Sequence, residues 1–295
     1  MREPGKSGRL LVVGTPIGNL EDLSPRALRA LKEANAIFCE DTRVTGKLAA
    51  RFGLEAARLS CPAPREKRRA EELLRRLAAG ETVALVTDAG MPGLSDPGEH
   101  LVAAAAGAGH AVHVIPGPSA PAAALAVSGL PAVPHLFLGF LPSRAVERRR
   151  LLEEIRGRPE TLVWFEAPHR LLDSLEDAAR TLGDRRACVA RELTKIHEET
   201  ARGTLEQLAA SFRTRGEERG EATVVVEGNR ERPAMMSEGE VDREIRKALA
   251  AGKQKRAVAR ELARRSGRPA REVYARAVAL SARRAEHGSP GKTEP

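Results

Sequence analysis

The sequence predicts an α/β protein with two α/β domains, followed by a small all-α region. Short continuous apolar runs, which are typical of buried parallel strands, alternate with helical patterns through most of the 295 residues. Three of these runs lead directly into loops rich in Gly and Pro, at residues 11–19, 83–98 and 111–121. After residue 240 the strand patterns stop, and the remaining patterns are helical and basic.

The first domain is expected at residues 10–117, as a parallel, right-handed series of strands and helices. Its strands are predicted at 10–13, 36–40, 83–87 and 111–115, and its helices at 24–33, 45–53, 65–80 and 98–109. Ser24 and Pro25 form a typical helix start, an N-cap followed by Pro at the first helical position. Gly53 and Gly80 are expected to end the second and third helices.

The second domain is expected at residues 118–229, and residues 230–240 are interpreted as a polar, Pro-containing linker. The predicted strands are 135–141, 161–166, 187–192 and 221–228, and the predicted helices are 118–129, 145–156, 169–183 and 203–216, the last with Thr204 as its N-cap. The polar ends of the chain, residues 1–9 and 288–295, are expected to be disordered.

The basic region at residues 241–287 holds 14 basic and 5 acidic side chains, whereas residues 1–240 hold 34 of each. Its three helical patterns lie at 241–251, 254–265 and 269–282, and the last two resemble a helix-turn-helix outline. Their shared core is predicted to contain Val258, Leu262, Val273, Tyr274 and Leu280. This density of positive charge indicates a nucleic-acid partner, with a solvated helical surface as the alternative. The candidate RNA contacts are Lys253, Lys255, Arg256, Arg268 and Arg271.

Several classes of protein and ligand are not supported by the sequence. No segment reaches the roughly 18 apolar residues of a membrane helix, and the polar start of the chain does not form a signal peptide. The three cysteines are far apart and lack metal-binding spacing, which indicates a cytoplasmic protein without a metal site. The loop at residues 14–19 lacks the glycine spacing of a dinucleotide fold and the lysine of a phosphate-binding loop, so NAD and ATP are not expected.

The three Gly/Pro loops are expected to meet at one ligand cleft. Ligands of open α/β sheets bind outside the carboxyl ends of the strands, which is where all three loops begin. Gly lets the main chain approach a ligand closely, and Pro fixes the shape of a loop. The pattern therefore predicts a small-molecule site formed largely by backbone groups.

Carboxylates follow two of the predicted strands. Glu40 ends one strand and is followed by Asp41, and burying two carboxylates there is costly without partners. They form either a salt-bridged corner with Arg43 or hydrogen-bond and proton acceptors in the cleft. Asp88 directly follows another buried strand and can accept from a ligand hydroxyl or amine, whereas Asp96 is interpreted as a cap of the next helix.

Charged residues of the second domain also gather near strand ends. Arg191 and Lys195 are candidates for holding RNA phosphates, and pairing with Glu192 and Glu198 is the alternative interpretation. His169 opens a predicted helix and is interpreted as a cap or surface residue.

Seven motifs, taken in order, resemble one family. They are GTPIGNLEDLS, EDTR, TDAGMPGLSDPG, PGPSA, GFLP, EAPHRLLDSLED and ARELTKIHEE. This series resembles the bacterial ribosomal RNA small-subunit methyltransferase I family, which belongs to the tetrapyrrole-methylase-like superfamily of S-adenosylmethionine (AdoMet) enzymes. The resemblance covers residues 10–228 nearly continuously, and the basic region resembles the family's C-terminal helical domain.

The resemblance implies two α/β domains of the tetrapyrrole-methylase type with AdoMet in the cleft between them, usually in a homodimer. By motif position, the implied AdoMet-binding residues are Asp88, Ala89, Gly90, Ser119, Ala120, Phe165, Glu166 and Ala222. Pro16 in the first loop is implied to border both cofactor and target nucleotide. The segment at residues 59–69 departs from the His/Asn-rich pattern of relatives, so no substrate contact is carried over to it.

The implied activity is transfer of the AdoMet methyl group to the 2′-hydroxyl of a cytidine in the decoding region of 16S rRNA, as free RNA or in the 30S subunit. In-line displacement at an activated sulfonium depends largely on positioning, and a carboxylate would help to remove the proton of a weakly acidic hydroxyl. We expect Glu40 and Asp41 as proton acceptors oriented by Arg43, with Arg191 and Lys195 holding the RNA backbone.

Two other interpretations stay open. A small-molecule methyltransferase of the tetrapyrrole type would share the cofactor cleft but would not need the basic region. A non-catalytic RNA-binding or ribosome-assembly protein would use the basic region and would transfer no methyl group.

Overall fold

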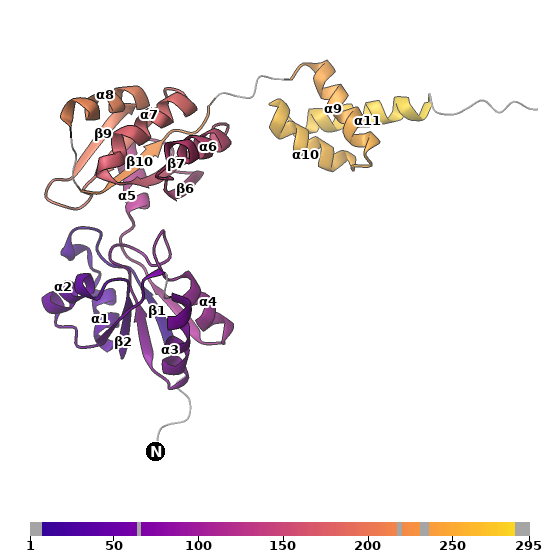
Figure 1. Ribbon diagram of the computed structural model, residues 1–295. Coiled ribbons are helices and arrows are strands. Elements are labelled where there is room, and N and C mark those ends of the chain that lie inside the picture. Colours follow the sequence, from indigo (N-terminus) through magenta and orange to yellow (C-terminus); the bar gives the residue numbers. More distant parts are fainter. Residues whose placement is uncertain (1–7, 64–65, 217–219, 231–235, 287–295) are drawn as a thin grey trace, which may run out of the picture. The chain divides into compact units, whose positions relative to one another are not determined.

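The computed structural model describes residues 8–63, 66–216, 220–230 and 236–286 (Figure 1). The chain divides into two compact units, residues 1–228 and residues 229–295. The disorder predicted for the two ends of the chain concerns residues that lie almost entirely outside the described part. None of the described helices combines the length and the apolar character that crossing a membrane requires.

The first sheet is parallel throughout, with strand order β3-β2-β4-β1-β5. Its strands are β1 (Arg9–Val13), β2 (Ala36–Cys39), β3 (Ala57–Ser60), β4 (Thr82–Leu85) and β5 (Ala111–Ile115). The four predicted strands and their parallel arrangement are confirmed, whereas β3 was not predicted. Because β3 is an edge strand of exposed and half-buried residues, it carries no continuous apolar run.

Helices cover both faces of this sheet. They are α1 (Pro25–Glu33), α2 (Thr42–Phe52), α3 (Glu66–Ala78) and α4 (Glu99–Gly107). Leu11 and Ile37 pack with α1 and α2, whereas Leu10 and Phe38, their neighbours in β1 and β2, pack with α3 and α4. Successive strand residues point to opposite faces, so one continuous apolar run supplies two cores.

The helix starts of this domain follow local capping. Ser24 accepts a hydrogen bond from the backbone N–H of Ala27, and Pro25 is the first residue of α1, as predicted. The helix α2 begins earlier than predicted, because the Asp41 side chain accepts from the backbone N–H of Arg43 and caps it. Gly53 ends α2 in the left-handed conformation, at φ 66°.

The interpretation of Asp96 as a helix cap is wrong, because the start of α4 is capped from another helix. Gly98 is the N-cap residue, and the buried carboxylate of Glu66 in α3 accepts hydrogen bonds from the backbone N–H groups of Gly98 at 2.8 Å and Leu101 at 3.2 Å. Asp96 is therefore available to line a cavity.

The second sheet is mixed, with strand order β6-β7-β10-β8-β9. Its strands are β6 (His135–Phe140), β7 (Thr161–Glu166), β8 (Arg186–Arg191), β9 (Glu199–Thr204) and β10 (Ala222–Val226). β6 and β7 are parallel, whereas β10 is antiparallel to both β7 and β8. β9 was not predicted, because this polar edge strand has neither an apolar run nor regular alternation.

Helices also cover the second sheet. They are α5 (Ala120–Ser128), α6 (Ala145–Ile155), α7 (Leu171–Leu182) and α8 (Leu205–Arg215). The last three pack over a core that includes Trp164 and Phe212, whereas α5 packs with Val163 and Val225 on the other face (Figure 1). Thr204 caps α8 as predicted, in a capping box with Gln207.

The second unit is a three-helix bundle of α9 (Glu238–Ala250), α10 (Lys255–Ser266) and α11 (Ala270–Glu286). Ser237 caps α9 in a capping box with Glu240, so the helix begins before residue 241. Tyr274 was expected in the core but is 38 % exposed. Val241 and Ile245 of α9 occupy the core that we expected α10 and α11 to close by themselves.

A candidate cofactor and substrate cleft

One cavity of about 440 Å³ opens within the first unit, between loops that follow strands of both sheets. Nine of the predicted site residues line it: Glu40, Asp88, Ala89, Gly90, Ser119, Ala120, Phe165, Glu166 and Ala222. The other predicted residues of this unit do not line it: Pro16, Asp41, Arg43, Arg191 and Lys195. Asp96 faces the same cavity, although it was expected to cap a helix.

The three Gly/Pro loops of the first domain meet through close backbone contacts. Thr15 and Gly90 exchange backbone hydrogen bonds of 2.9 and 3.2 Å, and the Thr15 hydroxyl donates to the carbonyls of Thr87 and Gly90. A Cβ on Gly14 would lie 2.6 Å from Sδ of Met91 and 2.7 Å from the backbone of Gly117. The first loop can therefore contact the other two only because residue 14 is Gly.

The first loop also contacts the second domain. The backbone N–H of Asn19 donates to Oγ1 of Thr194 at 3.0 Å, and a Cβ on Gly18 would lie 2.6 Å from Cγ of Lys195. Pro16 is buried in this loop and does not reach the cavity, whereas its neighbour Ile17 lines it. The loop thus bridges both walls of the cleft through its backbone.

Glu40 is the carboxylate of the EDTR motif that faces the cavity. It accepts a hydrogen bond from Oγ1 of Thr87 at 3.3 Å. Burial raises the pKa of Glu40, and the nearby carboxylates of Asp88 and Asp96 raise it further. A carboxylate with a raised pKa in a cleft is suited to accept a proton.

Asp41 has a different environment, although it is the next residue. Its side chain caps α2 and pairs with Arg43, whose Nη2 lies 2.6 Å from Oδ2. Hydrogen bonds from Arg43 lower the pKa of Asp41 to about 2. Its backbone N–H donates to Oδ1 of Asp88 at 3.1 Å, so Asp41 contacts the cleft through its main chain.

Asp88 and Asp96 make the first wall of the cleft acidic. Burial is the largest cause that raises the pKa of each carboxyl, and neighbouring carboxylates add to it. Together with Glu40 they favour a positively charged ligand, because such a ligand would offset both desolvation and mutual repulsion.

The second wall is apolar and aromatic, and it rests on ion pairs. The ring centroids of Phe140 and Phe165 lie 5.4 Å apart, and both side chains line the cavity. Glu166 also lines it, and Oε1 lies 3.2 Å from Nε of Arg170. Burial raises the pKa of Glu166, and the charge of Arg170 opposes that shift.

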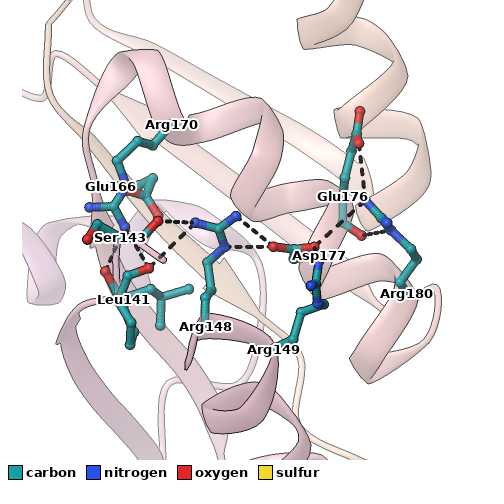
Figure 2. A network of polar contacts seen from close by, with 10 residues as sticks. Leu141, Ser143, Arg148, Arg149, Glu166, Arg170, Glu176, Asp177 and Arg180 are labelled. Atoms are coloured by element: carbon teal, nitrogen blue, oxygen red, sulfur yellow. Dashed lines mark hydrogen bonds and ion pairs between the residues drawn. The ribbon is translucent and has the colours of Figure 1, made fainter. Parts of the chain in front are cut away.

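A network of arginines supports the turn that follows Phe140 (Figure 2). Arg170 donates to the carbonyl of Leu141 at 2.6 Å, and Arg148 donates to that of Ser143 at 3.3 Å. Nη2 of Arg148 lies 2.6 Å from the carboxylate of Asp177, and both side chains are at most 4 % exposed. The position of Phe140 in the cavity wall thus depends on buried charges of the second domain.

Arg191 and Lys195 are both ion-paired, as the alternative interpretation had it, although Arg191 pairs with Glu199. Nη1 of Arg191 lies 2.8 Å from Glu199. Nζ of Lys195 lies 2.9 Å from Glu192 and 3.3 Å from Glu221. Their role in holding RNA stays a prediction. It would require both side chains to leave their carboxylate partners and bind phosphate instead.

The predicted RNA contacts of the second unit fall into two groups. Lys253 pairs with Glu261 at 2.8 Å, and Arg268 pairs with Glu272 and donates to the carbonyl of Met236 at 3.3 Å. The others, Lys255, Arg256 and Arg271, form no ion pair within the part of the chain that the structure describes. Arg268 ties the start of α9 to α11, so its contacts are structural.

Sequence reasoning missed several residues of the cleft: Ile17, Met91, Leu94, Phe140, Leu193, Glu221 and Thr223. Phe140 is the last residue of β6 and lies near the end of the strand predicted at 135–141, so the rule that selected Glu40 and Asp88 applied to it as well. Glu221 and Thr223 lie at the start of β10, where that rule predicts no site. Across the described ranges, no three His, Cys, Asp or Glu side chains are placed to bind a metal.

Comparisons with known proteins identify the family. Residues 9–209 match the model of the Tetrapyrrole (Corrin/Porphyrin) Methylases. A relative from Synechocystis named ribosomal RNA small subunit methyltransferase I is 42 % identical over 93 % of this chain and 99 % of its own. The chain belongs to that family. The relatives of the same name from Halalkalibacterium halodurans and Thermotoga maritima are 46 % and 44 % identical, over 76 % and 75 % of this chain and 78 % and 99 % of theirs.

Solved structures of the methylase superfamily share the fold of this family member. The methyltransferase CobJ matches with a TM-score of 0.58 at 22 % identity, over 76 % of this chain and 95 % of its own. Uroporphyrin-III-C-methyltransferase from Thermus thermophilus matches with a TM-score of 0.53 at 21 % identity, over 74 % and 94 %. These matches confirm the predicted tetrapyrrole-methylase type of fold.

Enzymes of this family use AdoMet as methyl donor, and the cleft residues fit that molecule. A volume of about 440 Å³ lies within the range of small-molecule sites, roughly 300–1,000 Å³. The half-buried carboxylates Glu40, Asp88 and Asp96 suit a ligand with positively charged sulfonium and ammonium groups. Phe140 and Phe165 offer apolar surface for an adenosine.

Proposed function

We propose that this chain transfers the methyl group of AdoMet to the 2′-hydroxyl of a cytidine in the decoding region of 16S rRNA. The observation that carries the proposal is the match to the Synechocystis relative, which covers 93 % of this chain and therefore extends into the basic helices. A small-molecule methylase would need no such region. The names of the matching family model and of distant structures at 17–22 % identity favour that alternative, but the family model ends at residue 209, before the basic helices.

The chemistry requires positioning and removal of a proton. AdoMet, when bound, supplies a methyl group on a sulfonium that is already a good leaving group. Gly90 and Ala89 offer backbone groups at the cavity wall, and the contact of Gly14 with Gly117 holds the neighbouring loops in place. Fixed loops of this kind lower the entropic cost of aligning the ribose oxygen with the methyl group.

Glu40 is our candidate for the proton acceptor. It lines the cavity and its pKa is raised, so it binds a proton more readily than an ordinary carboxylate at a strand end. Asp41, with a pKa of about 2 and a side chain directed to Arg43, acts instead by orienting Asp88 through its backbone N–H. Arg43 in turn holds Asp41, because its Nε and Nη2 donate hydrogen bonds to the Asp41 carboxylate.

RNA is held, in this proposal, by cations of the basic helices that form no ion pair with a described residue, above all Lys255, Arg256 and Arg271. Their phosphate contacts would supply affinity that the neutral charge balance of residues 1–240 does not. We also propose that the enzyme acts in the cytoplasm and forms a homodimer. Analytical ultracentrifugation at micromolar concentration tests the dimer directly.

The deciding experiment incubates the full chain and radiolabelled AdoMet with naked 16S rRNA and with assembled 30S subunits. We expect label in one ribose of the decoding region, mapped by resistance of the following bond to alkaline cleavage. A protein that binds RNA and transfers no label is a binding module, and transfer to a tetrapyrrole in place of RNA identifies a small-molecule enzyme.

A truncated chain without residues 230–295 separates the two units. We expect it to bind AdoMet with normal affinity and to lose most of its affinity for RNA. Retention of full RNA affinity would show that the basic helices are not the main RNA contact.

A further inference from the structure

The first turn of α3 separates its charges into inward-facing and outward-facing side chains. Glu66 is 4 % exposed, and its carboxylate accepts from the backbone N–H groups of Gly98 and Leu101. Arg69 donates to the carbonyl of Ser60 at 3.0 Å and pairs with Glu72. The side chains of these two residues therefore serve the fold.

Lys67 and Arg68, which lie between them, are exposed. Neither forms an ion pair with any residue that the structure describes, and Glu71, one turn further on, pairs with neither. Cations in the first turn of a helix are not favoured by its dipole, and a Lys before a Glu is the weaker order for an i,i+4 pair. These two side chains thus contribute little to the stability of α3.

The later cations of the same helix differ. Arg76 lies 2.9 Å from Glu81 and 3.7 Å from Glu72, so its charge is offset within the domain. Arg75 is exposed, but it lines a cavity of about 560 Å³ together with Arg68 and therefore belongs to the same surface. Arg29 of α1, on the opposite face of the sheet, is exposed and forms no ion pair among the described residues. It provides a matched comparison for charge on another helix.

The first turn of α3 lies at the edge of the sheet where the cleft opens. Ser60, which accepts from Arg69, donates to the backbone carbonyl of Glu40 at 3.3 Å. Glu66 holds Gly98, which closes the loop that begins with Asp88. The residues on either side of Lys67 and Arg68 are therefore linked by hydrogen bonds to the cavity wall. Arg69 is linked through Ser60 to Glu40, and Glu66 is linked to the loop that begins with Asp88.

An acidic cleft presents a problem for an enzyme that acts on a polyanion. Glu40, Asp88 and Asp96 favour the cofactor, yet their charges repel the phosphates on either side of a target nucleotide. Cations at the rim offset this repulsion locally, and exposed Lys and Arg side chains are the groups that bind RNA phosphates.

We propose that Lys67 and Arg68 form a phosphate-binding site for rRNA at the rim of the cleft, separate from the basic helices of the second unit. The inference rests on the proposed function and adds a second RNA contact, in the α/β unit itself. Its role is to hold the backbone next to the reacting nucleotide, whereas the basic helices add affinity for the RNA as a whole.

The test compares the full-length Lys67→Gln/Arg68→Gln double variant, an Arg29→Gln variant and the wild type. RNA affinity is measured from 50 to 300 mM KCl with a decoding-region fragment of 16S rRNA. Each phosphate contact contributes roughly 0.7–0.9 to the slope of log affinity against log salt. We expect the double variant to lose about 1.5 from this slope and to bind several-fold more weakly, and Arg29→Gln to match the wild type.

Two further measurements separate RNA contact from damage to the fold. AdoMet affinity and unfolding temperature should be unchanged in the double variant, because both side chains are exposed. The exchange Lys67→Arg/Arg68→Lys should keep the wild-type slope. An unchanged slope in the double variant, or an equal loss in Arg29→Gln, overturns the inference. If the wild type itself methylates no rRNA substrate, it is the proposed function that fails.

Discussion

The two walls of the cleft are fixed in different ways. The first sheet is parallel throughout, so its loops all leave from one edge, and glycines let them touch backbone to backbone. The second sheet is mixed, and its edge at the cleft combines the ends of β6, β7 and β8 with the starts of β9 and β10.

The charges differ in the same way. Carboxylates of the first wall face the cavity with raised pKa values, whereas Glu166 of the second wall pairs with Arg170, and Glu192 pairs with Lys195. The comparison teaches that backbone contacts leave the side chains of the first wall available for chemistry. In the second wall, side chains are used to hold the backbone.

The strongest test of the first wall replaces each of its two neighbouring carboxylates, Glu40 and Asp41, by the corresponding amide. Glu40→Gln should lower the methyl-transfer rate by about 10²–10⁴-fold, because it removes the proposed proton acceptor. Asp41→Asn should cost far less. The pKa of Asp41 is already about 2, so this residue stays ionised at any pH of interest.

The pH dependence of the rate adds a control. Because the pKa of Glu40 is raised, its carboxylate form is lost as the pH falls through a value above that of an ordinary Glu. The wild-type rate should therefore fall on the acid side, and Glu40→Gln should lack this decline. Equal rates for wild type and Glu40→Gln at saturating AdoMet would remove Glu40 from the mechanism.

Among the ion pairs of the second domain, the buried pair of Arg148 and Asp177 should contribute most to the free energy of unfolding. Asp177→Ala leaves Arg148 buried without an anion and should lower the free energy of unfolding by about 3–5 kcal/mol. Glu154→Ala, which breaks an exposed pair with Arg150, should cost less than about 0.5 kcal/mol. Urea unfolding of both variants gives the comparison, and similar values would contradict the assigned role of the buried pair.

Gly14→Ala tests the backbone contact of the first wall. The added Cβ would press on Met91 and Gly117, with an expected loss of about 1–3 kcal/mol in stability and a weaker affinity for AdoMet. Gly46→Ala in α2 meets no atom within 4 Å and should stabilise the protein by about 0.5–1 kcal/mol. Calorimetric titration with AdoMet separates a displaced loop from a general loss of stability.

The smallest expected effect is proton release on cofactor binding. A cationic ligand lowers the raised pKa values of Glu40, Asp88 and Asp96, so binding at acid pH should release a fraction of a proton. The release should diminish as the pH rises, because more of these carboxyls are then ionised before the ligand binds. Titration in buffers of different ionisation enthalpy measures the difference, and proton uptake in the acid range would contradict the charge assigned to the first wall.

Much of the first wall was predictable because a parallel sheet obeys a simple rule. Glu40 and Asp88 follow buried strands of a parallel sheet, and both line the cavity. The rule does not distinguish Glu40 from Asp41, since the difference lies in the direction of each side chain. Asp96 was interpreted as a cap from its place just before Pro97 and Gly98, because the actual capping carboxylate of Glu66 lies 32 residues before Gly98 and gives no local signal.

The second wall was less predictable on physical grounds. Ala222 was placed by resemblance alone, since the antiparallel direction of β10 cannot be read from an apolar run. Arg148 and Asp177, 29 residues apart, look like ordinary surface charges of two amphipathic helices. Ion pairs between distant residues carry no local signal, whereas a Gly/Pro loop after a strand does.

The backbone bridge between Thr15 and Gly90 affects which amide protons exchange first with solvent. Surface loops are normally the first segments to exchange their amide protons with solvent. Here the amide protons of both residues are held in a two-way pair of hydrogen bonds that no single loop can break alone. They should exchange as slowly as the adjoining strands β1 and β4, so that the loops of the cleft belong kinetically to the core.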